Sequence, residues 1–207
     1  QLLEHAATML ELPDTFGLTL GDRKVTAADG RVLTLTDIGL SSLHMQNQHQ
    51  IIATASHTSP MSPPPTAAQF AEIEVDTETG QIEVERLLML VDCGRAINPL
   101  TAAGQVEGGM SQGLGFALTE EMLFDDKGQP LNPSLVKYHV PKAAEMPVMD
   151  TIFIQTEEPS GPYGAKSVSE IAIDGVAPAV TNALHNATGA WVRELPLTPA
   201  RVLAGLK

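Results

Sequence analysis

Residues 69–92 contain a long strand–turn–strand pattern that constrains the fold more than any other stretch of the chain. The segment reads QFAEIEVDTETGQIEVERLLMLVD. Phe70, Ile73 and Val75 approximate one face of a first strand, DTETG supplies the turn, and residues 87–91 form an apolar second run. Alternating apolar residues around a short polar turn are typical of an antiparallel hairpin. We therefore predict a long hairpin within a sheet.

A glycine-rich helical pattern follows the hairpin. Residues 101–122 read TAAGQVEGGMSQGLGFALTEEM, with helical periodicity. The glycines inside this pattern are Gly104, Gly108, Gly109, Gly113 and Gly115. Each interior glycine costs roughly 1 kcal/mol relative to alanine, so the surroundings must compensate. The usual compensation is close approach of another backbone, or of a ligand, to a face without side chains.

Helical and extended patterns are interspersed irregularly along the rest of the chain. Helices are predicted at residues 2–10, from about residue 36, across residues 171–189 with a kink or new start near Pro178, and at residues 197–206. Strands are predicted within residues 18–35, from residue 48 and at residues 149–156, and the prolines at 63–65 favour an extended connector. This order indicates an α+β fold, with a mixed or antiparallel sheet and packed helices. We expect residues 1–65 to lead into a core formed by residues 66–207.

The charge of the chain narrows its range of partners. Twenty-five acidic residues against 12 basic ones give a net charge of −13. Because no basic stripe is present to neutralise phosphates, nucleic acid and anionic membranes are poor partners. No apolar run approaches the length needed to cross a bilayer. A single cysteine, Cys93, excludes an internal disulfide, suits a reducing cytoplasmic compartment and is expected to be a small buried hydrophobe.

The histidines form no recognisable metal-binding motif. They are His5, His44, His49, His57, His139 and His185. None lies at the spacing of a zinc motif or of a facial triad, so a metal held by protein side chains is not expected. A phosphate loop is not expected either, because GPYGAK at residues 161–166 is too short.

Glu170 has two open interpretations. It comes just before an apolar helical pattern, where the helix dipole favours an acid. Alternatively, its neighbours Val168 and Ile171 could desolvate the carboxylate and suit it to general-base work. The residues alone leave both interpretations standing.

Six stretches point together to one family. They read AEIEVDTETG, VDCGRAINP, GQVEGGMSQGLGFALTEE, LNPSLVKYHVPKAAEMP, GPYGAKSVSE and ELPLTPARVL, and they span about two thirds of the chain. In order and spacing they resemble the C-terminal part of the molybdenum-binding large subunit of the xanthine dehydrogenase and aldehyde oxidase family. The chain begins with Gln1 inside a helical pattern, so we expect a fragment of a longer protein, with residues 1–207 forming a C-terminal molybdopterin-binding domain.

The resemblance implies a molybdenum hydroxylase that oxidises a purine, an aldehyde or an N-heterocycle. In that family molybdopterin, often as its cytosine dinucleotide, holds molybdenum without a protein ligand. Glu170 matches the family's base, which takes a proton from Mo–OH while that oxygen attacks the substrate and hydride moves to Mo=S. Gln105 lies 170 − 105 = 65 residues earlier and matches an amide that contacts the oxo ligand of the metal.

The resemblance also implies backbone contacts to the pterin. Lys166, Ser167, Val168 and Ser169 would line the cofactor, and Gly104 would begin a helix that the cofactor approaches closely. Many family members have glycine where this chain has Ser169. If that position requires a positive φ, serine strains it, and otherwise serine adds a hydrogen bond.

The implied partners lie outside the chain. They are the N-terminal half of the molybdenum subunit, iron–sulfur clusters and FAD on other domains or subunits, and a small-molecule substrate. Most pocket residues of the family lie upstream, so we expect the chain to be inactive alone. The alternative is a non-catalytic scaffold or assembly domain derived from the same family. Ser169 favours this alternative, whereas the presence of Glu170 and Gln105 weighs against it.

Overall fold

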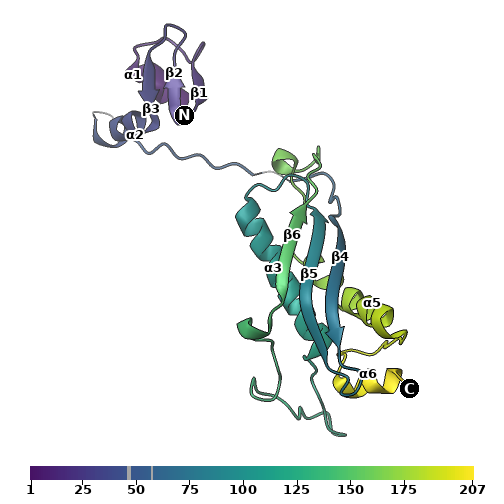
Figure 1. The fold of residues 1–207 in the computed structure, drawn as a ribbon. Coiled ribbons are helices and arrows are strands. Elements are labelled where there is room, and N and C mark those ends of the chain that lie inside the picture. The colour runs from purple at the N-terminus through teal and green to yellow at the C-terminus, as the bar shows by residue number, and fades with distance from the viewer. Residues whose placement is uncertain (46–47, 57) are drawn as a thin grey trace. The chain divides into compact units, whose positions relative to one another are not determined.

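The chain folds into two compact units, residues 1–58 and residues 59–207. The structure is a computed structural model that describes residues 1–45, 48–56 and 58–207, so the interpretation of His57 lies outside the described residues. Each unit has its own cluster of buried side chains. Figure 1 shows the helices and strands of each unit. The division falls a few residues before the limit at residue 65 that the sequence suggested.

The first unit is a small three-stranded sheet with two helices. Its elements are α1 (Leu2–Met9), β1 (Thr19–Gly21), β2 (Lys24–Thr26), β3 (Val32–Thr34) and α2 (Leu35–His44), and the strands pair antiparallel in the order β1-β2-β3. The core includes Ala6, Val25 and Ile38, which are fully buried. Helix α2 begins with a capping box, in which the side chains of Thr34 and Asp37 each accept a hydrogen bond from the other's backbone N–H. The described residues 48–56 form no strand, so the prediction of a strand from residue 48 is wrong. The reason is that an extended segment becomes a strand only where a partner strand pairs its backbone groups.

The second unit combines a three-stranded sheet with helices. Its elements are β4 (Thr66–Val75), β5 (Ile82–Asp92), α3 (Pro99–Leu118), a 3-10 turn (Ala143–Glu145), β6 (Val148–Phe153), a second 3-10 turn (Pro162–Gly164), α4 (Ile171–Asp174), α5 (Val176–Thr188) and α6 (Pro199–Gly205). Strand β4 pairs antiparallel with β5, and β6 pairs parallel with β5. Figure 1 shows α3 running beside β6 and α5 beside β4. The predicted hairpin and the α+β class with a mixed sheet are confirmed.

The central strand supplies the core of the second unit. Leu87, Met89 and Val91 alternate along β5 and are at most 2% exposed. Because alternate side chains share one face of a sheet, one face of β5 is buried. This face packs against the buried side chains of α3 and α5, namely Val106, Met110, Leu114, Val176, Val180 and Leu184.

Two details of the sequence prediction are wrong. Phe70 does not share a face with Ile73 and Val75. The Phe70 side chain is 56% exposed, whereas the side chains of Ile73 and Val75 pack against the core. Phe70 is an odd number of residues away from both Ile73 and Val75, and successive side chains of a strand point to opposite faces, so the Phe70 side chain lies on the other face of the sheet. The helix predicted over residues 171–189 breaks at Gly175 and not at Pro178. Proline is tolerated in the first turn of α5 because N–H groups there lack an intrahelical acceptor.

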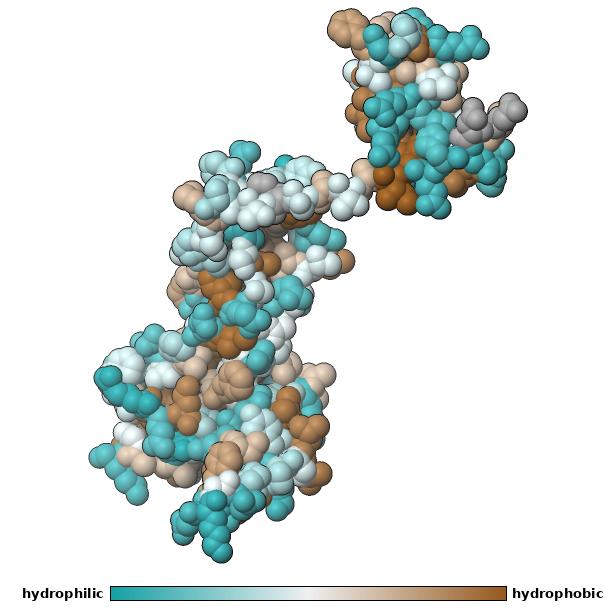
Figure 2. All heavy atoms as spheres, turned by 180° about the vertical axis from the view of Figure 1, so that it is seen from behind, coloured by the Kyte–Doolittle hydropathy of each residue, from teal (hydrophilic) through white to brown (hydrophobic). Residues whose placement is uncertain are grey.

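Apolar side chains also reach the surface. Figure 2 shows hydrophobic atoms scattered among hydrophilic ones on the face that it presents. Among the residues that the structure describes, five large apolar or aromatic side chains are 81–96% exposed: Phe16, Leu100, Leu135, Val136 and Tyr163. Apolar side chains exposed singly are normal on a protein surface. Among the described residues, no helix is long and apolar enough to cross a membrane.

Candidate functional site

A small cavity lies between the middle of α3 and the start of α4. Its volume is about 150 Å³. The lining residues are Gly104, Gln105, Gly108, Gly109 and Gln112 from α3, with Ser169, Glu170 and Ile173 from the α4 region. The fold therefore brings Gln105 and Glu170 to one hollow, although 65 residues separate them in the sequence (170 − 105).

The glycines of α3 fall on two faces with different surroundings. A Cβ atom added at Gly104 or Gly108 would meet nothing within 4 Å. A Cβ atom at Gly109 would lie 2.6 Å from the Cβ atom of Ala172, and one at Gly113 would lie 2.8 Å from a methyl group of Val176. Helix packing therefore accounts for Gly109 and Gly113. Space for a ligand remains an explanation only for Gly104 and Gly108.

Glu170 is at the start of α4 and is exposed. It occupies the N-cap position, with φ −77° and ψ −12°, but its side chain does not cap the helix. The first of its two interpretations, an acid at a helix N-terminus, describes its placement in this chain. The second interpretation, an acid desolvated by apolar neighbours, does not describe it.

The loop before Glu170 is fixed to the end of β5 through its backbone. Lys166 N–H donates to the Cys93 carbonyl at 2.7 Å, and Arg95 N–H donates to the Gly164 carbonyl at 2.8 Å. Gly94 has φ +65°, and a Cβ atom there would lie 2.3 Å from the Gly164 carbonyl oxygen. Only glycine therefore fits this close crossing. Cys93 is buried, as predicted.

The Lys166 side chain forms an ion pair beneath the same loop. Its Nζ lies 2.8 Å from Asp92 Oδ2, and the two side chains are only 10% and 18% exposed. The Thr156 hydroxyl and the Gly94 N–H donate to Asp92 Oδ1 at 2.7 and 2.9 Å. The hydrogen bond from Lys166, helped by those from Thr156 and Gly94, outweighs desolvation and lowers the pKa of Asp92 to about 2.

The structure does not place all the predicted pterin contacts at the cavity. Ser169 lines it, but Lys166, Ser167 and Val168 do not. Val168 instead packs against the core, and Ser167 is exposed. Ser169 is not among the residues with positive φ, so serine causes no left-handed strain there.

Sequence reasoning missed several residues of this cavity. Gly108, Gly109, Gln112 and Ile173 were not predicted as site residues, yet they line it. A signal for two of them was present. Gly108 lies four residues after Gly104, and Gln112 lies seven residues after Gln105, which places each pair on one face of a helix.

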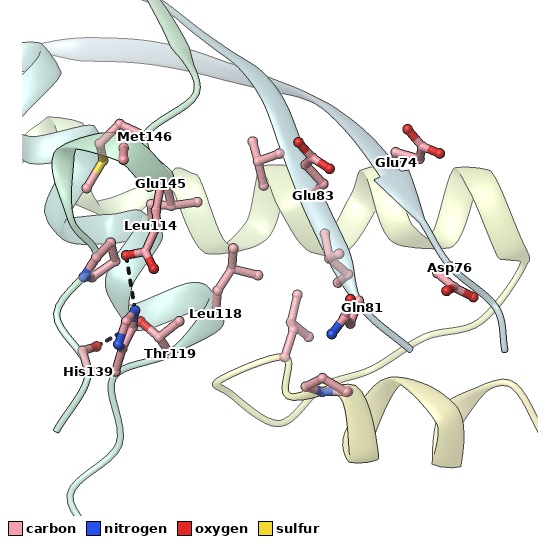
Figure 3. Close-up of a pocket in the computed structure, with 16 residues that line it drawn as sticks. Glu74, Asp76, Gln81, Glu83, Leu114, Leu118, Thr119, His139, Glu145 and Met146 are labelled. Carbon is pink, nitrogen blue, oxygen red and sulfur yellow. Dashed lines mark hydrogen bonds and ion pairs between the residues drawn. The ribbon is translucent and has the colours of Figure 1, made fainter. Parts of the chain in front are cut away.

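A larger cavity lies elsewhere in the second unit. Its volume is about 660 Å³, and it is lined by the turn end of the β4–β5 hairpin, the end of α3, residues 139–146 and the start of α6. Figure 3 shows His139 and Glu145 on one side of it, joined by an Nε2–Oε2 contact of 3.2 Å. None of the predicted site residues lines this cavity. Within the part of the chain that the structure describes, no group of three or more His, Cys, Asp or Glu residues could hold a metal ion.

Comparison with protein families gives one match over most of the chain. Residues 1–147 match the family described as molybdopterin cofactor-binding domain. The chain belongs to this family. The resemblance noted in the motifs is thereby confirmed.

Relatives and solved structures agree with this assignment. The chain is 37% identical over its whole length to the probable hypoxanthine oxidase of Escherichia coli K12, and 35% identical to a putative xanthine dehydrogenase molybdenum-binding subunit of the same organism. It covers 22% and 29% of those proteins. A Cu,Mo-CO dehydrogenase has a similar fold over 98% of this chain and 26% of its own, with a TM-score of 0.81 and 26% identity. The chain thus spans about a quarter of the length of these relatives.

Proposed function

We propose that the chain is the C-terminal portion of the molybdenum-binding large subunit of a molybdenum hydroxylase. Its substrate would be a purine, an aldehyde or an N-heterocycle. The observation that carries the proposal is the small cavity, which combines Glu170, Gln105 and a face of α3 without side chains. Relatives named as a hypoxanthine oxidase and as a xanthine dehydrogenase subunit support the class of reaction.

The residues present fit a molybdopterin cofactor. Gly104 and Gly108 leave open space beside α3, which a Cβ atom would narrow. The neutral amide of Gln105 can donate a hydrogen bond without competing for a proton. When bound, the cofactor, which we propose to be molybdopterin or its cytosine dinucleotide, would supply the metal and the redox chemistry. Of the four predicted backbone contacts to the pterin, only Ser169 lines the cavity. We propose that Lys166, Ser167 and Val168, which precede it, form the backbone segment that positions Ser169 beside the cofactor.

The chain's own residues would perform proton transfer and orientation. A Glu170 carboxylate oxygen would accept the proton that the oxidation of the substrate releases, as a general base. Gln105 would orient the reacting group by donating from its side-chain amide. In this chain Glu170 is exposed, so the remainder of the subunit would exclude water from it.

The proposal extends to partners and location. The N-terminal half of the large subunit would complete the pocket. Iron–sulfur clusters and FAD on other domains or subunits would carry the electrons away. We place the assembly in the cytoplasm, and we expect this chain to be inactive alone.

The decisive experiment uses the full-length enzyme with its partner subunits. Glu170→Gln is expected to keep the molybdenum content and to lower turnover by about 10²-fold or more, because the general base is lost. Glu85→Gln removes an exposed acid outside the cavity and is the matched control. Full turnover in Glu170→Gln rejects the base assignment. If the unmodified protein never incorporates molybdenum, the non-catalytic scaffold is the better description.

A further inference from the structure

The short helix that carries Glu170 is fastened from the sheet by a residue that neither the motifs nor the cavity identifies. Gln69 lies on β4, 103 residues before Ala172, and its Nε2 donates to the Ala172 carbonyl at 2.7 Å. The same nitrogen lies 3.2 Å from Met89 Sδ. The amide must point its nitrogen at this carbonyl, since its oxygen cannot donate.

Helix α4 depends on such outside contacts. It spans only Ile171–Asp174, and its first backbone bond runs from Ile173 N–H to the Glu170 carbonyl at 3.1 Å. A single helical turn is not stable by itself, because nucleation costs more than one turn of hydrogen bonds returns. On its other side α4 packs closely on α3, where Gly109 gives room to the Ala172 methyl group.

Gly175 shows how closely Gln69 is fitted under this helix. A Cβ atom at Gly175 would lie 2.1 Å from Gln69 Oε1. The backbone of Gly175 has φ −93° and ψ −8°, which any residue can adopt, so only the space taken by Gln69 requires glycine there. Gln69 Oε1 is itself buried and has no hydrogen-bond partner among the described residues. Leaving a buried polar atom unpaired costs free energy, so stability alone does not explain a glutamine at this position.

We propose that Gln69 is a positioning residue for Glu170: its side-chain amide holds α4, and with it the backbone of Glu170, beside Gln105 at the cavity. This inference rests on the proposed role of Glu170. A base must lie within hydrogen-bond reach of the proton that it takes, and small displacements reduce turnover strongly.

The test uses Gln69→Met in the complete molybdenum-loaded enzyme. Methionine keeps the length and the apolar stem, but it removes both the donor to Ala172 and the unpaired oxygen. We expect kcat to fall about ten- to a hundredfold while KM stays within about threefold. In a Glu170→Gln background the same change should lower kcat by less than about twofold, because residues that act through one group are not additive. Gln81→Met, at an exposed turn position, is the matched control and should leave kcat unchanged.

A second variant and a second measurement keep the test independent of turnover. Gly175→Ala pushes the Gln69 amide aside without changing it, and should reproduce the loss of kcat. Backbone amides of α4 should exchange with solvent about tenfold faster in both variants. The proposal is overturned if Gln69→Met lowers kcat equally with and without Glu170, or if turnover and α4 exchange are both unchanged. Full turnover in Glu170→Gln alone would instead reject the proposed function, and α4 exchange would still decide whether Gln69 holds this helix.

Discussion

The predicted site residues differ in how far the sequence could define their roles. Glu170 and Gln105 were identified through motifs, and the fold places both at one cavity. Lys166 belongs to the same motif, but its ammonium group is directed at Asp92. No pattern links Gln69 to Ala172 across 103 residues. Side-chain partners of this kind depend on tertiary packing, so local sequence does not reveal them.

The Asp92–Lys166 pair makes stability depend on pH in the acid range. The pKa of Asp92 is about 2 in the folded chain against an ordinary value of 3.8. Because the folded pKa is depressed, the stabilisation is complete above about pH 4 and is lost as the pH falls towards 2. We expect Asp92→Asn to lower the free energy of unfolding at pH 7 by about 1–2 kcal/mol after allowance for solvent screening.

Urea unfolding of the second unit between pH 2 and pH 7 checks this prediction. The difference between Asp92→Asn and the unmodified chain should shrink steadily below pH 4. Asp150→Asn is the matched control, since its ion pair with Arg86 is almost half exposed and should contribute about 0–1 kcal/mol. A loss that is the same at pH 7 and pH 2 would mean that the carboxylate charge is not the cause.

At the level of elements, the sequence predicted those helices and strands whose formation depends on hydrophobic periodicity and on turn residues. The β4–β5 hairpin and the helix predicted at residues 197–206 both formed as expected. The break at Gly175 was not predicted, and the glycine there leaves room for the Gln69 side chain, which comes from a distant strand. The strand expected from residue 48 had a favourable composition but no partner strand.

Adjacent glycines of α3 should respond in opposite directions to the same substitution. Gly108→Ala adds a methyl group in open space and should stabilise the chain by about 0.5–1 kcal/mol through helix propensity. Gly109→Ala forces a methyl group to within 2.6 Å of the Ala172 Cβ atom, and should destabilise the chain by about 1–3 kcal/mol. Thermal unfolding of the two variants measures both signs. Two stabilising substitutions would show that α3 and α4 are not in close contact.

For the whole molecule, the sequence motifs cover only the second unit, whereas the family match also includes the first unit with its separate core. The motifs that suggested the family lie from residue 71 onwards. The family match nevertheless begins at residue 1 and includes the first unit, which has its own buried cluster around Val25 and Ile38. The family match therefore extends to a part of the chain that the six motifs do not cover. The match gives no information on the rest of the pocket, because the chain covers only 22–29% of the length of these relatives.

Two separate cores predict two separate responses to core substitutions. Ile38 and Leu184 are both fully buried, the first in the cluster of residues 1–58 and the second in that of residues 59–207. Replacing either by alanine leaves a cavity and should cost about 2–5 kcal/mol. Amide hydrogen exchange should then accelerate in the unit that carries the substitution, with protection in the other core unchanged within about 0.5 kcal/mol. Equal acceleration in both clusters after Leu184→Ala would show that the chain unfolds as one cooperative unit.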